Sequence, residues 1–194
     1  TMTRGQLEAW GANMEKVYAV ECGVNFSDIR SIVSSVESYK YDAVYMKRLQ
    51  AVKGIFDIID IWQEVMVVRK NATILIIGEG IDGARAKEIV KERGLGQNIL
   101  FAGVIYDPVE KFTKLAESKL FVLPTHEENW AIVIGEAMAA GVPVITYALK
   151  ELLDVWGDNL AAVPVGNKEA FAEKILHLLE DPVEWEALKE DGLA

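Results

Sequence analysis

The sequence has very little cysteine and no excess of positive charge. Its 194 residues include a single cysteine, Cys22, which excludes an internal disulfide and favours a reducing compartment. Lys and Arg number 20 against 30 Asp and Glu. The resulting net charge of −10 argues against nucleic acid or an anionic membrane as the main partner.

Long apolar runs are missing from the sequence as well. Glu136, Gly141 and Pro143 interrupt the longest apolar run, so no transmembrane segment is predicted. We also expect no signal peptide before the domain. We therefore expect a cytoplasmic protein, with a peripheral position at a membrane left open for the full-length chain. Met2 follows Thr1, which indicates a fragment of a longer protein.

What the sequence does contain is a regular alternation of short β-rich runs and helical segments. The predicted strands are Val17–Val20, Ala43–Met46, Thr73–Ile77, Ile99–Phe101, Leu120–Leu123, Val144–Ile145 and Leu160–Val163. The predicted helices are Gly54–Arg69, Ala84–Glu92, Glu110–Ser118, Trp130–Ala140, Lys168–Leu179 and Pro182–Lys189. This order predicts a three-layer, Rossmann-like, doubly wound α/β fold with a mainly parallel sheet. Ligands of such sheets bind at the carboxyl ends of the strands.

The glycine-rich segment that follows the strand Thr73–Ile77 is one candidate site. Gly78-Glu-Gly80-Ile-Asp-Gly83 matches the G-x-G-x-x-G dinucleotide pattern, and Asp107 lies downstream where an acid would meet a ribose. The pattern normally follows the first strand of a domain, and glycines are also usual in a tight turn between a strand and a helix. We interpret the segment mainly as a turn that lines a phosphate pocket, and an NAD(P)-binding oxidoreductase domain stays the less favoured alternative.

Two cations follow the strand Ala43–Met46. Arg48 and Lys53 lie in the loop before the helix that begins at Gly54, where a strand end and a helix amino terminus together suit an anion. A solvated basic loop is the alternative interpretation.

Two glutamates, Glu128 and Glu136, lie within the largely apolar stretch Thr125–Gly141. Apolar residues surround Glu136, and a buried carboxylate needs a partner or a ligand, so we predict that it binds a ligand, with a buried ion pair as the alternative. Glu128 lies eight positions earlier, about 12 Å away if the segment is helical. That distance matches the separation of a ribose and a hexose in a nucleotide-diphosphate sugar, and a carboxylate suits a vicinal diol. A solvated loop acid or a helix-start acid is the alternative for Glu128.

These segments together resemble a known family. Glu128-x7-Glu136, preceded by Pro124-Thr125 and followed by Ala137–Ile145, resembles the signature of the retaining group 1 glycosyltransferases of GT-B architecture. Three further segments resemble motifs of that family in order and spacing: Arg48–Gly54 (R-L-x-x-x-K-G), Ile76–Gly80 (I-x-G-x-G) and Ile99–Gly103. Gly23-Val-Asn25 lies where the family has G-V-D after its interdomain connection.

The resemblance implies a role for each matched position. Glu136 would bind the donor ribose, Glu128 would contact the transferred sugar, and Arg48 and Lys53 would bind the diphosphate and stabilise the leaving group. The remaining donor-binding positions implied are the amides of Asn129, Trp130 and Ala131, the base-binding region at Gly103 and Val104, and the turn glycines Gly78 and Gly80.

The resemblance also implies an activity and a domain arrangement. The protein would transfer a hexose from a UDP-, GDP- or ADP-linked donor to an acceptor glycan or lipid-linked sugar, with retention, without a metal and without a cofactor. Residues 17–194 would form the donor-binding domain, and residues 1–16 would connect it to a missing amino-terminal acceptor domain. We therefore expect the isolated domain to bind a nucleoside diphosphate but to transfer little. A non-catalytic nucleotide-sugar binding subunit stays open as an alternative.

Three positions depart from the family pattern. Asn129-Trp130-Ala131 replaces the usual G-F-G, so the sugar subsite is expected to differ. Lys150-Glu151 stands at the positions of a Gly-Gly turn, with Asp154 at the following acid, which leaves the sugar preference open. Lys47 replaces the usual glycine before the arginine.

Overall fold

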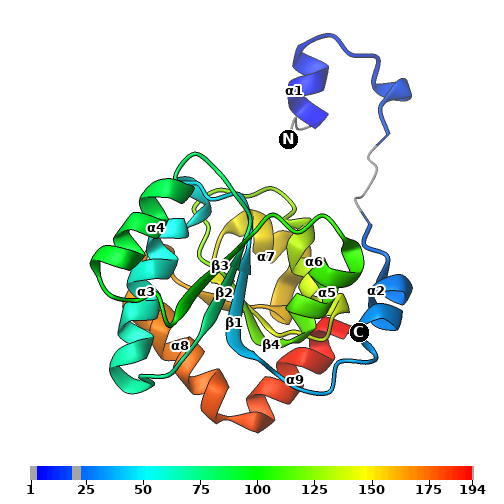
Figure 1. The fold of residues 1–194 in the computed structure, drawn as a ribbon. Coiled ribbons are helices and arrows are strands. Elements are labelled where there is room, and N and C mark those ends of the chain that lie inside the picture. Colours follow the sequence, from blue (N-terminus) through cyan, green and yellow to red (C-terminus); the bar gives the residue numbers. More distant parts are fainter. Residues whose placement is uncertain (1–3, 19–22, 194) are drawn as a thin grey trace.

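The computed structural model describes residues 4–18 and 23–193, and its centre is a parallel sheet. The sheet has six strands in the order β3-β2-β1-β4-β5-β6, and every neighbouring pair is parallel (Figure 1). The strands are β1 (Tyr41–Met46), β2 (Ile74–Ile77), β3 (Ile99–Gly103), β4 (Ser118–Leu123), β5 (Val144–Tyr147) and β6 (Ala161–Val163). The predicted doubly wound, Rossmann-like fold is thereby confirmed.

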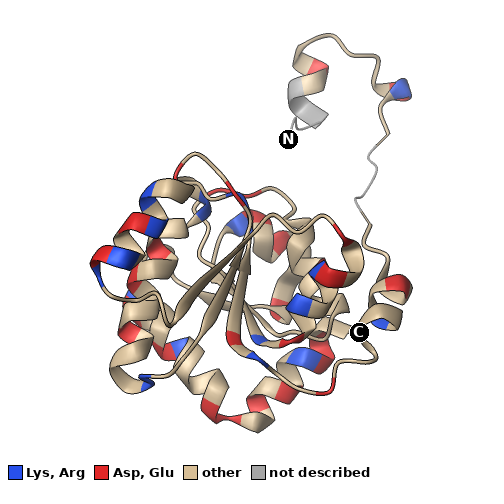
Figure 2. Cartoon of the chain, in the orientation of Figure 1, with Lys and Arg blue, Asp and Glu red and all other residues tan. Residues whose placement is uncertain are grey.

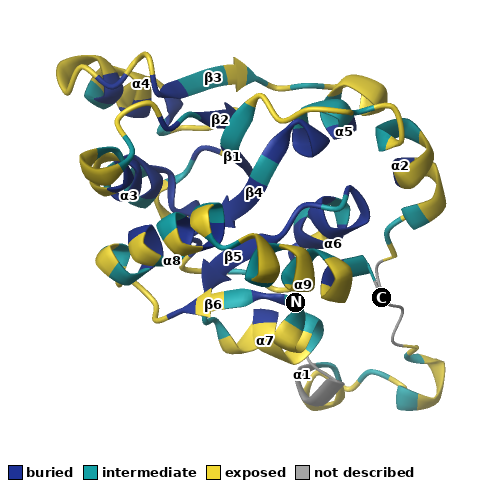
Figure 3. Cartoon of the chain, turned by 90° about the horizontal axis from the view of Figure 1, so that it is seen from below, coloured by how far each residue is buried: buried dark blue, intermediate teal, exposed yellow. Residues whose placement is uncertain are grey.

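Helices cover both faces of this sheet. The helices of the described residues are α1 (Arg4–Ala9), which lies apart from the sheet, and α2 (Phe26–Val33), α3 (Ile55–Val68), α4 (Gly83–Glu92), α5 (Pro108–Ala116), α6 (Ile132–Ala139), α7 (Lys150–Trp156), α8 (Lys168–Glu180) and α9 (Pro182–Leu193) (Figure 1). Three short 3₁₀ turns complete the elements: η1 (Met14–Lys16), η2 (Ala51–Lys53) and η3 (Gly157–Asn159). One face carries α3, α4 and α8, and the other carries α5 and α6, with α2 packed outside them (Figures 1 and 3). After α8, the chain crosses to the second face, where α9 packs on α6.

The core lies between the sheet and these helices. Strands β2 and β5 are buried along their whole length, as the burial colours show (Figure 3). The predicted apolar stripe of α3 is confirmed: Ile55, Ile58, Ile59, Trp62 and Val65 are all buried, and Met66 packs half-buried at their margin. The described residues that contribute to the core begin at Val24. The charged residues lie mostly on helices and loops, and the strands are largely free of them (Figure 2).

Some predicted elements differ from the structure. Of the predicted strand Val17–Val20, residues 17 and 18 have no regular structure, and residues 19 and 20 lie outside the described residues. Helices α2 and α7 were not predicted. Helix α2 packs against the core through buried Ile29 and through the partly buried Phe26, Ile32 and Val33. The segment predicted as the connection, residues 1–16, contains α1 and η1, and its role stays a prediction.

The strand order determines where a ligand can bind. The chain runs from β1 outward to β3, then returns to β4 on the other side of β1 and runs outward to β6. The loops after β1 and β4 therefore leave the sheet on opposite faces and open a crevice between them at its carboxyl edge. Arg48 and Lys53 follow β1, and Glu128 follows β4.

Candidate functional site

The loop after β1 is held in place by the glycine-rich loop after β2. The backbone N–H of Leu49 donates to the carbonyl of Glu79 (3.0 Å), and that of Asp82 donates to the carbonyl of Leu49 (3.1 Å). The Asp82 carboxylate accepts a hydrogen bond from the Ala51 N–H at 2.7 Å. A Cβ at Gly80 would lie 2.3 Å from the carbonyl oxygen of Leu49. Glycine is therefore required there for the two loops to touch, and the Gly78–Gly83 segment supports the Arg48 loop.

The structure gives Asp107, the second feature of the predicted dinucleotide site, a structural role. Asp107, the acid expected to meet a ribose, is the N-cap of α5 and accepts the Glu110 N–H at 3.0 Å. The pattern also follows β2, whereas the central leading strand of the sheet is β1. Both observations favour the interpretation of a structural turn beside a phosphate pocket.

The loop after β4 is pinned onto the loop after β1. Gly54, with φ +84°, lies against Pro124 so closely that a Cβ would come within 1.9 Å of the Pro124 carbonyl oxygen. The His126 N–H donates to the carbonyl of Val52 at 2.9 Å, and the Lys53 ammonium donates to the carbonyl of Glu127. The residues predicted on separate strand ends are thus brought together.

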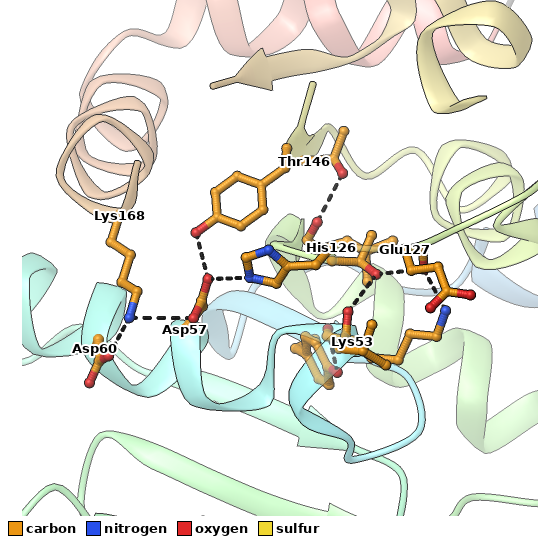
Figure 4. A network of polar contacts seen from close by, with 12 residues as sticks. Lys53, Asp57, Asp60, His126, Glu127, Thr146 and Lys168 are labelled. Atoms are coloured by element: carbon orange, nitrogen blue, oxygen red, sulfur yellow. Dashed lines mark hydrogen bonds and ion pairs between the residues drawn. The ribbon is translucent and has the colours of Figure 1, made fainter. Parts of the chain in front are cut away.

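A polar network in the first turn of α3 strengthens this junction (Figure 4). One Asp57 carboxylate oxygen lies 2.8 Å from His126 Nε2 and accepts the Tyr147 hydroxyl at 2.8 Å. The other oxygen lies 3.4 Å from the Lys168 ammonium, which also binds Asp60 at 2.6 Å. Burial and the hydrogen bond to Asp57 raise the pKa of the Tyr147 hydroxyl. Burial would raise the pKa of Asp60 too, but Lys168 and Arg93 outweigh it and leave that pKa below its ordinary value.

Glu128 is more enclosed than a solvated loop acid or a helix-start acid would be. Its side chain is only 7% exposed, and its Oε1 lies 2.6 Å from Lys47 Nζ and 3.4 Å from Lys53 Nζ. The same Oε1 has no partner in hydrogen-bond geometry among the described residues. The solvated loop acid is therefore wrong for Glu128, and a buried carboxylate between two ammonium groups replaces it. Burial and the nearby Glu128 charge both raise the pKa of the Tyr45 hydroxyl, which donates to the carbonyl of Lys53.

Glu136 is less enclosed than predicted. Its side chain is 18% exposed, and its Oε1 accepts a hydrogen bond from Lys111 Nζ at 2.8 Å. The expectation that it has no solvated face is wrong, because α6 turns this position toward the crevice and α5 supplies a cation. The ion pair weighed as the alternative is present, and the carboxylate still borders open space.

That open space is a hollow of about 360 Å³ at the carboxyl edge of the sheet. Four of the predicted site residues line it, namely Arg48, Gly78, Val104 and Glu136, together with Lys47 and Lys111. Arg48 is exposed and makes no ion pair among the described residues. Gly80, in the loop after β2, and Gly103, the last residue of β3, are not among the lining residues.

The segment Asn129–Ala131 differs from the predicted helix start. Helix α6 begins at Ile132, and Ala131 is its N-cap with a left-handed φ of 50°. The helical 12 Å spacing between the two glutamates is therefore wrong, because Glu128 lies in the loop before the helix. Trp130 packs edge-on against Trp156 of α7, which also donates to the Trp130 carbonyl. In the part of the chain that the structure describes, the amides of residues 129–131 donate to no protein acceptor, so they stay available to a ligand.

Sequence reasoning missed three contributors to this site. Lys111 and Asp57 come from helices that carry no motif, and only the packing of α5 beside α6 and of α3 beside α8 brings them here. Lys47 was visible as the residue that replaces a glycine, but its contact with Glu128 was not predicted.

Within the described part of the chain, the side chains that could ligate a metal do not gather in the crevice. Across residues 4–18 and 23–193, one grouping of three such side chains occurs, formed by His177, Asp181 and Glu184. It lies at the end of α8 farthest from Lys168, and His177 and Lys174 already pair with Glu184. His126, the other histidine, pairs with Asp57 instead.

The fold and the crevice define a Rossmann-like α/β domain with a hollow, lined by Lys47, Arg48 and Lys111, at its switch point. Comparison with known proteins narrows this class. A family profile described as "Glycosyl transferases group 1" matches residues 29–193, and the chain belongs to this family.

Relatives and solved structures agree with this membership. The chain is 28% identical over 140 residues to N-acetyl-alpha-D-glucosaminyl L-malate synthase of Bacillus anthracis, covering 71% of this chain and 36% of that protein. Its fold is similar to that of S. aureus TarM in complex with fondaparinux, alpha-GlcNAc-glycerol and UDP, with a TM-score of 0.80, 18% identity and coverage of 99% and 38% of the two chains. The C-terminal domain of LpcC, a group 1 glycosyltransferase of Francisella tularensis, gives 0.74 at 22% identity, with 88% and 95% covered.

The chain thus spans about a third of the length of the first curated relative. None of the helices in the described residues is both long and apolar enough to cross a membrane.

Proposed function

We propose that this chain is the donor-binding, carboxyl-terminal domain of a glycosyltransferase. The whole protein would transfer a hexose from a nucleotide-diphosphate sugar to an acceptor glycan or lipid-linked sugar. The observation that carries the proposal is the meeting of Lys53 and Glu128 from two loops at the β1–β4 switch point, with a hollow lined by Arg48 and Glu136 at the same edge of the sheet. Membership of the group 1 family supports it.

The contacts support a division of roles along the donor. Arg48, which has no protein partner among the described residues, and Lys53, held by Glu127, would bind the diphosphate. The unpaired amides of residues 129–131 would add hydrogen bonds to the same group. A positive charge held next to the leaving diphosphate stabilises the charge that develops there as the sugar departs.

The two carboxylates would bind the hydroxyl-bearing ends of the donor. Glu136 borders the hollow with one ion pair and would accept hydrogen bonds from the ribose diol. Glu128 would accept a hydroxyl of the transferred sugar, since its Oε1 has no hydrogen bond of its own. Gly78, Gly103 and Val104, at the β2 and β3 ends, would adjoin the base, and Gly80 would keep the neighbouring loop close.

The remaining features of the reaction follow the family resemblance. We propose retention of the anomeric configuration and no requirement for a divalent metal, because Arg48 and Lys53 supply fixed positive charge to the diphosphate. No further cofactor is proposed. Residues 1–16 would lead from an amino-terminal domain that binds the acceptor, and the reaction would take place on the cytoplasmic side.

Titration calorimetry on the present chain tests the binding role. We expect one of UDP, GDP and ADP to bind with a dissociation constant at or below the millimolar range, with no change when EDTA is added. NADH serves as the comparison ligand for the dinucleotide alternative and should not compete. Absence of binding by all three nucleoside diphosphates at millimolar concentration would contradict the proposal.

A further inference from the structure

Lys47 stands where the family pattern has a glycine, so no side chain was expected to contribute to the site from this position. It follows β1 directly, and its backbone N–H donates to the carbonyl of Ile77 at 3.1 Å. Its carbonyl is also fixed, because a Cβ built on Gly78 would come within 2.1 Å of it. The backbone of Lys47 is therefore held in place, and only its side chain is free to change partner.

The partner that it reaches is the carboxylate of Glu128. Lys47 Nζ lies 2.6 Å from Glu128 Oε1, closer than the 3.4 Å of Lys53 Nζ to the same atom. All three side chains are well enclosed, with 16%, 7% and 11% exposure for Lys47, Glu128 and Lys53. Two ammonium groups therefore share one enclosed carboxylate.

The charges around the cleft do not balance. The cations are Lys47, Arg48, Lys53 and Lys111, and the carboxylates are Glu79, Glu128 and Glu136, so four positive charges face three negative ones. This local excess occurs in a chain of net charge −10. The one cation of these four that is exposed and makes no ion pair among the described residues is Arg48, which lines the hollow, so an anion entering the hollow would balance the excess. Lys47 lines the hollow beside Arg48, so an anion in the hollow lies within reach of it.

We propose that Lys47 is a third diphosphate-binding residue, which holds Glu128 while the cleft is free of donor and releases it when the donor binds. The proposal rests on the donor-binding function proposed above. The Lys47 ammonium moves from Glu128 to the incoming diphosphate, and the Glu128 carboxylate turns to a hydroxyl of the donor sugar. The Lys47 ammonium and the Glu128 carboxylate therefore each have a partner both with and without the donor. Since the family pattern has a glycine at this position, the exchange is a property of this chain.

The first experiment compares Lys47→Met with the unmodified chain by calorimetry, using the nucleoside diphosphate that binds best among UDP, GDP and ADP. We expect Lys47→Met to weaken binding of the diphosphate about 10- to 100-fold, as for the loss of a charged hydrogen bond. Binding of the corresponding nucleoside, which has no phosphate, should change less than about twofold. Lys91→Met, at an exposed position on α4, is the matched control and should leave both affinities unchanged.

Two further variants separate charge from structure. Lys47→Arg keeps the cation and should restore the affinity to within several-fold of the unmodified chain. Glu128→Gln removes the competing carboxylate and should tighten diphosphate binding several-fold, a result that does not depend on Lys47→Met being folded. Circular dichroism checks the fold of each variant.

The outcomes distinguish this inference from the function on which it rests. If the unmodified chain binds a nucleoside diphosphate but a folded Lys47→Met binds it equally well, Lys47 is only a structural partner of Glu128 and the inference is wrong. Equal loss of nucleoside and diphosphate binding would overturn it in the same way, because the effect would not follow the charge. If the unmodified chain binds no nucleoside diphosphate at all, the proposed function fails, and the inference fails with it.

Discussion

At the scale of single residues, the two glutamates of the cleft differ in how many cations they meet. Glu128 faces two enclosed ammonium groups, and Glu136 faces one at the border of the hollow. A carboxylate with a single partner keeps lone pairs for a ligand, since its two oxygens offer about four acceptor sites. Glu136 can therefore bind a diol without leaving Lys111.

This argument predicts the effect of Glu136→Gln on nucleotide binding. We expect the variant to weaken binding of a ribonucleoside diphosphate about tenfold, because a charged acceptor is lost. Binding of the 2′-deoxy analogue, which lacks one hydroxyl of the diol, should change much less. Calorimetry with both ligands checks this, and Glu88→Gln on the exposed side of α4 is the control. Equal effects on the two ligands would remove the ribose from the role of Glu136.

A second prediction concerns Gly54, which joins the two loops. Gly54→Ala should destabilise the fold by about 3 kcal/mol or more, because its φ is +84° and the new Cβ would lie 1.9 Å from a backbone oxygen of Pro124. Gly94→Ala shares a positive φ of 69° but meets nothing within 4 Å, so only about 1–2 kcal/mol is expected. Urea denaturation of both variants measures the difference. Similar losses would show that the contact with Pro124 carries no energy.

At the scale of elements, the first turn of α3 connects three parts of the fold. Asp57 contacts His126 in the loop after β4, Tyr147 at the end of β5 and Lys168 at the start of α8 (Figure 4). Since Glu128 lies two residues after His126, the position of α3 sets the position of Glu128. None of these four residues lines the hollow.

Asp57→Asn tests this connection. We expect a loss of about 2 kcal/mol in the free energy of unfolding, because the contacts of an enclosed carboxylate with His126 and Lys168 are weakened. Asp154→Asn, which breaks an exposed pair with Lys150, should leave the unfolding free energy unchanged within error. Chemical denaturation compares the two. If both variants unfold alike, the network of α3 contributes no more than a surface ion pair.

At the scale of the whole molecule, two buried tyrosine hydroxyls make the stability of the fold sensitive to alkaline pH. Burial raises the pKa of Tyr45 and Tyr147, so each holds its proton in the folded state beyond the unfolded pKa of about 10. Their stabilisation is fully present below pH 10 and is lost as pH rises above that value, because the unfolded chain then releases protons that the folded chain keeps.

Tyr147→Phe should reduce this alkaline sensitivity. At neutral pH the variant loses the hydrogen bond to Asp57 and about 1–2 kcal/mol of stability. Between pH 10 and pH 11.5, its unfolding free energy should fall less steeply with pH than that of the unmodified chain. Denaturation curves followed by circular dichroism at several pH values give both slopes. Parallel slopes would show that Tyr147 already ionises in the folded state.

The layered fold could be predicted because apolar runs and helical stripes repeat along the chain. The residues of the cleft were predictable in part: Arg48, Lys53, Glu128 and Glu136 stand in ordered motifs. Their surroundings were not predictable, and burial was expected at the wrong glutamate. The local pattern around Glu136 is apolar, but α6 begins only at Ile132 and turns that residue toward the hollow, while the polar neighbours of Glu128 fold over it.

The sequence by itself determined the parallel α/β architecture, the strand ends at which the candidate site lies and four of its candidate residues, Arg48, Lys53, Glu128 and Glu136. These follow from periodicity and from short motifs, which act over a few residues. Only the tertiary structure decided which cation meets which carboxylate. Lys47 reaches Glu128, Lys111 reaches Glu136 and Asp57 reaches His126 across 81, 25 and 69 positions, and such pairings depend on how loops and helices pack at the carboxyl edge of the sheet.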